Sequence, residues 1–230
     1  MISNPIPQTF VAVTRQAIAV TKIRGRRDTR EHLKRGFDVT MAMGIILAFL
    51  PLLMIVFAAL LVQGRPFLIR HQRVGRKGQV FPCLKFRTMV TDADAKLQEH
   101  LAASAEARAE WEATRKLKID PRVTALGRVL RKSSLDELPQ LFNVLRGEMS
   151  LVGPRPIVAA EVRHYGGSMS IYEQVRPGMT GAWQISGRND TSYARRVALD
   201  CEYVATQSFR GDLSILLRTF PAVLAARGSY

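Results

Sequence analysis

A run of 24 uncharged residues, Val39–Val62, constrains this chain more than any other feature. A helix needs about 20 apolar residues to cross a hydrocarbon core about 30 Å thick, so the run is long enough to enter a membrane. A buried core helix is the alternative, but 24 residues without a polar face are hard to bury in a chain of 230. A cleavable signal peptide is not expected, because the run begins late and exceeds the usual apolar stretch of about 7–15 residues.

The chain is also strongly basic. It carries a formal net charge of +15 and is 47% hydrophobic, a combination that excludes intrinsic disorder. Such a chain is expected to meet a polyanion, either a nucleic acid or an anionic membrane surface. Residues 1–90 hold 15 Lys or Arg against 3 Asp or Glu, whereas residues 91–230 have a net charge of only +3. Most of the excess therefore surrounds the apolar run.

Basic residues on both sides of the apolar run predict its topology. The positive-inside rule places such flanks in the cytoplasm, and a straight span cannot satisfy the rule at both ends. Pro51 lies inside the run, where a proline removes a backbone hydrogen bond and bends a helix. We therefore expect a re-entrant helix that enters the cytoplasmic leaflet, breaks at Pro51 and returns, with a kinked spanning helix as the alternative. The flanking cations are Arg24, Arg26, Arg27, Arg30, Lys34 and Arg35 before the run, and Arg65, Arg70, Arg73, Arg76 and Lys77 after it.

The remaining pattern predicts a mainly α protein with a few short strands. The expected regions are a basic mobile N-terminal tail (1–30), a membrane-inserted helix (31–64) and a cytoplasmic catalytic domain (65–230). The expected elements are an extended stretch at 79–87 and helices at 91–118, 123–131, 134–145 and 189–203. The apolar stretch 213–226 is too short to span a membrane, and we expect it to lie in the membrane interface as an amphipathic helix.

Adjacent carboxylates at Asp136 and Glu137 are the strongest candidates for chemistry. A purely structural explanation exists, because Ser134 and Glu137 have the spacing of a capping box and acidic residues favour a helix N-terminus. The functional alternative is a carboxylate nucleophile or a Mg²⁺ site beside phosphates. Arg131 and Lys132, just upstream, would hold a phosphate close to these carboxylates.

Further cations stand where they can bind phosphate, each with a plainer alternative. Arg155 is fixed between two prolines, in a rigid turn that can also present an ordinary surface arginine. Lys85 and Arg87 follow the apolar run closely, where lipid headgroups are the alternative ligand. Arg188 lies in a turn that can equally begin the next helix. The two cysteines and four histidines have no metal-ligand spacing.

Several longer motifs occur in a fixed order, and through them the chain resembles the bacterial sugar transferases, the monotopic polyprenyl-phosphate hexose-1-phosphate transferases. The resemblance runs from Lys34 to Tyr230, about 85% of the chain. Within the family, the short form most resembles the exopolysaccharide-initiating galactose phosphotransferases of rhizobia. The motifs are Lys34–Asp38, Lys85–Met89, Ser134–Leu141, Gly147–Pro156, Arg176–Gly181 and Trp183–Arg188.

The resemblance implies a defined reaction. A UDP-hexose would donate hexose-1-phosphate to undecaprenyl phosphate with release of UMP, as the first membrane step of exopolysaccharide synthesis. Galactose is the implied hexose and UDP-glucose is the alternative donor. The enzyme, a phosphoglycosyl transferase, would lie at the bacterial inner membrane among anionic lipids, with its catalytic domain facing the cytoplasm.

The resemblance also implies roles for single residues. By motif match, Asp136 would attack the β-phosphate and form a phosphosugar intermediate. Glu137 would assist Mg²⁺ binding or proton removal, and both carboxylates would be Mg²⁺ ligands. The residues Lys85, Arg131, Arg155 and Arg188 match those that hold phosphates or the leaving nucleotide. The membrane helix of the family usually breaks at Ser-Pro, whereas this chain has Leu50-Pro51.

A hypothesis from another class is a basic membrane adaptor or nucleic-acid-binding protein that uses the positive N-terminal third. It predicts strongly salt-dependent polyanion binding and no nucleotide turnover. The basic segment has no interleaved aromatic residues, which counts against nucleic acid as a partner. The sequence leaves the oligomeric state open.

Overall fold

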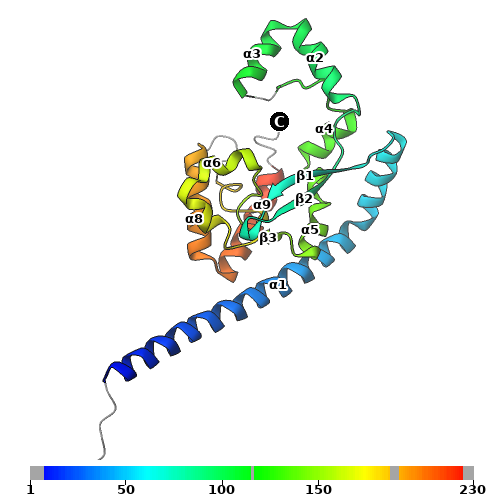
Figure 1. Cartoon of the computed structure of the whole chain (residues 1–230). Helices are drawn as coiled ribbons and strands as arrows, with labels where there is room; N and C mark the ends of the chain where they lie inside the picture. The colour runs from blue at the N-terminus through cyan, green and yellow to red at the C-terminus, as the bar shows by residue number, and fades with distance from the viewer. Residues whose placement is uncertain (1–7, 115–116, 187–191, 225–230) are drawn as a thin grey trace, which may run out of the picture.

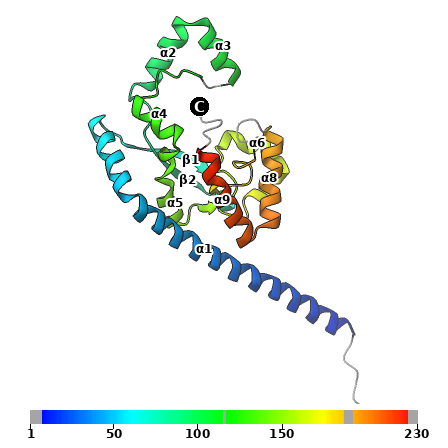
Figure 2. The ribbon, with the colours of Figure 1, turned by 180° about the vertical axis from the view of Figure 1, so that it is seen from behind.

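A computed structural model describes residues 8–114, 117–186 and 192–224. It is mostly helical and has two small two-stranded sheets, in agreement with the predicted fold class. The longest element is α1 (Gln8–Val62), which runs along one side of a body formed by the elements after residue 65 (Figure 1). The view from behind shows the same helix along the edge of this body (Figure 2).

Helix α1 is longer and more continuous than the sequence pattern suggested. Residues 8–30, part of the expected basic mobile tail, are helical from Gln8 onward, and no proline interrupts the helix before Pro51. Pro51 itself is accommodated inside α1, which changes direction towards its C-terminal, cyan end without splitting into two helices (Figure 1). Within the described residues, Thr29–Val62 is long and apolar enough to cross a membrane by length and composition.

Polar contacts fasten α1 to the body just before the apolar run. The Lys34 ammonium lies 2.7 Å from a carboxylate oxygen of Asp212 on α9 (Phe209–Leu224). The Ser150 hydroxyl donates a 2.7 Å hydrogen bond to the buried Asp38. Arg35 donates to two main-chain oxygens in the last turn of α5 (Gln140–Arg146). Some of the cations attributed to membrane orientation thus hold the protein together.

Apolar contacts fasten α1 to the body a second time, near the end of the apolar run. Val56 and Leu60 are buried in a cluster with Phe86 and Leu130, which belong to the body. The body therefore contacts α1 on both sides of the central part of the run. Much of the run between these contacts is exposed, including Met41, Met43, Leu47, Phe49, Leu50, Met54 and Ile55.

The strands form two separate pairs. The antiparallel hairpin consists of β1 (Leu68–Val74) and β2 (Val80–Phe86), and the parallel pair consists of β3 (Ser150–Val152) and β4 (Gly178–Thr180). The strand β2 matches the extended stretch expected at 79–87, whereas β1 was not predicted. A Cβ atom on Gly178 would lie 2.1 Å from the main-chain nitrogen of Gly153, so two glycine-containing motifs meet with almost no space between their backbones.

The helix expected at 91–118 is two helices, because the chain turns at Ser104. The Ser104 backbone is extended and its hydroxyl accepts a hydrogen bond from the amide of Ala107, which begins a new helix. The resulting hairpin projects from the body in both views (Figures 1 and 2). The helices after β2 are α2 (Ala93–Ala103), α3 (Ala105–Thr114), α4 (Ala125–Lys132), α5, α6 (Val162–Tyr165), α7 (Met169–Tyr172), α8 (Tyr193–Thr206) and α9.

The main core joins α1, β2, α5, β3, α8 and α9. Cys83 of β2 packs in it together with Val144 of α5, Val152 of β3 and Tyr203 of α8. Burial of this apolar surface is the main favourable contribution to the fold. Because β2 is held against α5, the residues near its end have fixed positions, and Lys85 is one of them.

Candidate active site

The structure brings the predicted carboxylate pair together with Lys85. Asp136 and Glu137 lie in a short 3₁₀ turn, η2 (Leu135–Glu137), and Lys85 lies near the end of β2. The Lys85 ammonium is 2.6 Å from Oε1 of Glu137 and 3.6 Å from Oδ2 of Asp136. Two motifs far apart in the sequence therefore form one cluster, which we call the carboxylate cluster (Lys85, Asp136 and Glu137).

Helix capping does not explain the two carboxylates. Ser134 makes no side-chain capping hydrogen bond, and its φ angle of 58° places it in the left-handed region. The capping-box alternative is therefore wrong, and the single helix expected at 134–145 is divided into η2 and α5. A non-glycine residue in this conformation is uncommon, and such residues concentrate at functional sites.

Burial and neighbouring charges set the protonation of the carboxylate cluster. Burial raises the pKa of Asp136 above its ordinary value; Lys85 opposes this effect, and the charge of Glu137 adds to it. Burial alone would lower the pKa of Lys85, but the two carboxylates outweigh burial and raise it. Lys85 consequently stays charged near neutral pH, beside a carboxylate that is more basic than an exposed aspartate.

Arg131 contributes a second positive charge to the carboxylate cluster from the last turn of α4. Its Nε atom donates a 2.9 Å hydrogen bond to the Thr88 hydroxyl, and its charge partly offsets the rise in the pKa of Asp136. The close approach of α4 to Thr88 depends on Gly127, where an added Cβ would lie 2.0 Å from the Thr88 main-chain oxygen. Arg131 thus has a fixed position near Asp136.

Asn143, which the sequence analysis did not identify, holds β2 in place. Its side chain is fully buried, accepts a 3.0 Å hydrogen bond from the amide of Leu84 and donates a 2.8 Å bond to the oxygen of Pro82. It also donates a 2.6 Å bond to Glu148. A polar residue between the buried Leu141 and Val144 is the signal that could have revealed it. Asn143 positions the strand that carries Lys85.

Arg87 lies away from the carboxylate cluster. Its guanidinium donates hydrogen bonds of 3.0 Å and 2.8 Å to the main-chain oxygens of Gln63 and Gly64, just after α1 ends. The side chain is buried, and its Nε and Nη1 atoms have no hydrogen-bond partner among the described residues. A contact with α1 thus occupies an arginine that we expected to bind phosphate. Arg188, another predicted phosphate ligand, lies outside the described residues.

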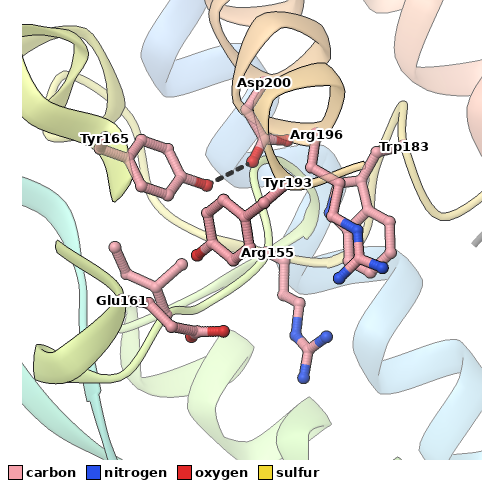
Figure 3. Close-up of a pocket in the computed structure, with 8 residues that line it drawn as sticks. Arg155, Glu161, Tyr165, Trp183, Tyr193, Arg196 and Asp200 are labelled. Atoms are coloured by element: carbon pink, nitrogen blue, oxygen red, sulfur yellow. Dashed lines mark hydrogen bonds between the residues drawn. The ribbon is translucent and has the colours of Figure 1, made fainter. Parts of the chain in front are cut away.

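Arg155 lines a small pocket (Figure 3). Its guanidinium carbon is 5.6 Å from the centre of the Trp183 ring. Burial raises the pKa of the Cys83 thiol to about 11, and the charges of Lys85 and Arg155 both oppose this rise. The Tyr172 hydroxyl lies within hydrogen-bond distance of the main-chain oxygens of Arg155 and of Val74 on β1, so Arg155 lies against the hairpin that carries Lys85. The pocket is lined by Arg155, Ile157, Glu161, Tyr165, Trp183, Tyr193, Arg196 and Asp200.

The donor set of the carboxylate cluster is suited to a magnesium ion only in part. No group of three or more His, Cys, Asp or Glu side chains that could hold a metal occurs among the described residues. Asp136 and Glu137 nevertheless supply hard carboxylate oxygens, and Mg²⁺ is commonly held by one or two carboxylates together with substrate phosphates. The pair therefore fits a cation that binds with a phosphorylated substrate.

Comparison with known proteins decides the family. Residues 29–226 match the family model described as bacterial sugar transferase. The chain belongs to this family. The transferase is 52% identical over 198 residues to the exopolysaccharide production protein ExoY of Sinorhizobium fredii, covering 86% of this chain and 88% of that protein. It is 50% identical to the undecaprenyl-phosphate galactose phosphotransferase of Salmonella typhimurium, over 86% of this chain but 42% of the longer relative.

A third relative carries a different sugar in its name. The UDP-glucose:undecaprenyl-phosphate glucose-1-phosphate transferase of Caulobacter vibrioides is 38% identical over 86% of this chain and 72% of its own length. The predicted family and the prediction of an enzyme, a phosphoglycosyl transferase, are both confirmed. A basic adaptor or a nucleic-acid-binding protein is not the class to which this chain belongs.

Proposed function

We propose that this transferase moves hexose-1-phosphate from a UDP-hexose to undecaprenyl phosphate, releasing UMP, as the first membrane step of exopolysaccharide synthesis. The observation that carries the proposal is the carboxylate cluster, whose buried Asp136 lies beside the charged Lys85. The names of the Sinorhizobium and Salmonella relatives agree with it. Galactose is the preferred hexose because the galactose relative is 50% identical, against 38% for the glucose relative.

The proposed chemistry proceeds in two displacements at one phosphorus atom. A carboxylate oxygen of Asp136 attacks the β-phosphorus of UDP-hexose, and the bond from that phosphorus to the bridging oxygen breaks, so UMP leaves with the electron pair. An oxygen of undecaprenyl phosphate then attacks the same phosphorus and releases the Asp136 carboxylate. Because the reaction has two steps, the soluble donor and the lipid acceptor do not have to occupy the site at the same time.

The cations near Asp136 have electrostatic roles in this proposal. Lys85 and Arg131 stabilise the negative charge that develops on the phosphoryl oxygens. Asp136 and Glu137 would hold Mg²⁺, which when bound neutralises part of the donor diphosphate charge. Arg155 is proposed to contact the diphosphate from the pocket side, and Arg188 remains a predicted phosphate ligand.

We further propose that α1 enters and leaves the membrane on its cytoplasmic side. Twenty-four helical residues measure about 36 Å at 1.5 Å per residue, so a straight span would place the two ends of the apolar run on opposite membrane surfaces. One body, however, contacts Asp38 before the run and Leu60 near its end. The exposed Phe209, Leu213 and Leu217 recur every four residues along α9, and we propose that they lie in the interface of the inner membrane with anionic lipids around them.

The experiment is release of UMP by the purified full-length protein, given undecaprenyl phosphate, Mg²⁺ and a panel of UDP-sugars. We expect turnover with UDP-galactose that exceeds turnover with UDP-glucose, and a loss of about 10³-fold or more in Asp136→Asn. Arg128→Met is the matched control, because Arg128 is charged, exposed and lies on α4, one turn before Arg131. Full activity in Asp136→Asn would exclude the covalent mechanism, and no UMP release with any UDP-sugar would exclude the reaction.

A further inference from the structure

Asp200 is a buried carboxylate that the proposed chemistry does not use. It lies on α8 with 2% of its surface exposed, and the Tyr165 hydroxyl donates a 2.7 Å hydrogen bond to its Oδ2 atom. Its Oδ1 atom is buried and has no hydrogen-bond partner among the described residues. An unpaired polar atom of this kind is costly in a core, and few are left in native proteins. The Oδ1 atom therefore points to a missing partner.

The surroundings of Asp200 indicate the chemistry of that partner. Asp200 and Arg155 both line the pocket of Figure 3. Burial raises the pKa of Asp200 and the charge of Arg155 opposes this rise, but the two side chains form no ion pair among the described residues. A phosphate placed on Asp200 would face a carboxylate, whereas a neutral hydroxyl group can donate to the Oδ1 atom. The pocket thus offers an acceptor for a hydroxyl at one point and a cation for a phosphate at another.

The pocket is joined to the hairpin that carries Lys85. Ile157, which lines the pocket, forms a β-bridge with Val74 of β1, and the Tyr172 hydroxyl lies 2.8 Å from the main-chain oxygen of Val74 and 3.2 Å from that of Arg155. A substrate whose phosphate lies between Lys85 and Arg155 would extend towards Asp200. Both ends of a UDP-hexose beyond its diphosphate, the hexose and the ribose, carry hydroxyl groups.

We propose that the Asp200 pocket is the hydroxyl-binding part of the donor site, in which Oδ1 of Asp200 accepts a hydrogen bond from a sugar hydroxyl of the UDP-hexose. The inference rests on the proposed function and adds the recognition of the donor to it. Tyr165 orients the carboxylate by holding its Oδ2 atom, which leaves Oδ1 free to accept.

The test compares Asp200→Asn with Tyr165→Phe in the full-length enzyme. Because the Tyr165 hydroxyl donates, the amide oxygen introduced by Asp200→Asn would face Tyr165 and the introduced NH₂ group would face the pocket, which replaces an acceptor by a donor. We expect Asp200→Asn to raise the KM for UDP-galactose about 10-fold or more, with the KM for undecaprenyl phosphate changed less than about twofold. Tyr165→Phe leaves the Oδ1 acceptor in place and is expected to raise the donor KM less than about threefold.

Inhibition by UMP separates the two sources of the hydroxyl. If the pocket binds the hexose, the inhibition constant of UMP is unchanged in Asp200→Asn; if it binds the ribose, that constant rises in parallel with the donor KM. An unchanged donor KM in Asp200→Asn, or equal increases in both variants, would overturn the inference. Absence of turnover in the wild-type enzyme would instead refute the proposed function.

A second measurement does not require the Asp200 variant to fold. In Asp136→Asn, which is expected to bind the donor without turning it over, hydrogen exchange of α8 is measured with and without UDP-galactose. We expect the donor to slow exchange around Asp200. Unchanged exchange in α8 at a donor concentration that protects the segment around Lys85 would also overturn the inference.

Discussion

The guanidinium of Arg87 donates a 2.8 Å hydrogen bond to the main-chain oxygen of Gly64. The acceptor follows the last turn of α1, and the donor lies two residues after Lys85. This contact joins the end of α1, the candidate membrane helix, to the strand that carries a residue of the carboxylate cluster. If α1 enters the membrane as we propose, Arg87 couples the position of the cluster to the membrane surface.

Arg87→Met should destabilise the enzyme by about 1–2 kcal/mol, because it removes the two hydrogen bonds that the buried guanidinium donates to the main-chain oxygens of Gln63 and Gly64. The measurement is thermal unfolding of the purified protein together with the rate of UMP release. Arg70→Met is the control, because Arg70 is an exposed arginine of β1. Equal melting temperatures for the two variants would show that the contact contributes nothing to stability.

The pH profile of the reaction should depend on Lys85. In the proposed mechanism Asp136 must be ionised to attack, so activity is present above the pKa of Asp136 and is lost as pH falls through it. Burial already raises this pKa, and Lys85 opposes the rise, so Lys85→Met should move the acidic limb of kcat/KM to higher pH. The shift is measured from UMP release between acidic and neutral pH.

The control for this profile is Arg128→Met, which removes an exposed positive charge from α4, the helix that carries Arg131. Its acidic limb should coincide with that of the wild type. An acidic limb in Lys85→Met at the wild-type pH, or below it, contradicts the assignment of Asp136 as the group that titrates.

Asn143→Leu should cost about 2–4 kcal/mol of stability, because it leaves the amide of Leu84 and the oxygen of Pro82 buried without partners. Asn143→Asp is the matched variant; it can still accept from Leu84 but places a carboxylate against the oxygens of Pro82 and Glu148, and its loss should be at least as large when measured by chemical denaturation. If the leucine variant were as stable as the wild type, Asn143 would not be what holds β2.

Cysteine labelling tests how α1 meets the membrane. Cys83 is buried and cannot report, so single cysteines are placed at His32 and Gln79, two exposed positions on opposite sides of the apolar run, in a Cys83→Ser, Cys201→Ser background. In sealed inverted inner-membrane vesicles, we expect a membrane-impermeant maleimide to label both positions. Labelling of one position in inverted vesicles and of the other only in right-side-out vesicles would establish a span.

Local sequence patterns predicted most of the helices and the strand β2, but not the tertiary contacts between elements. The apolar run predicts a helix, and the spacing around Asp136 brings Arg131 near it, because residues five apart stay close along the chain. By contrast, Lys85 meets Glu137 only because β2 packs beside η2, and Tyr165 meets Asp200 only because α6 packs on α8. Tertiary packing also explains why Arg87 is buried at the end of α1. The local pattern of charge does not reveal this contact.

The burial of Cys83 makes its thiol a probe of local opening in the enzyme. A thiol that is 2% exposed, with a pKa of about 11, reacts with an alkylating reagent only while the hairpin is detached from the core. In a Cys201→Ser background, the alkylation rate therefore reports how often β2, which carries Lys85, separates from the core. A ligand that contacts Lys85 would slow the alkylation of Cys83. The alkylation rate would then measure ligand binding in a variant that performs no turnover.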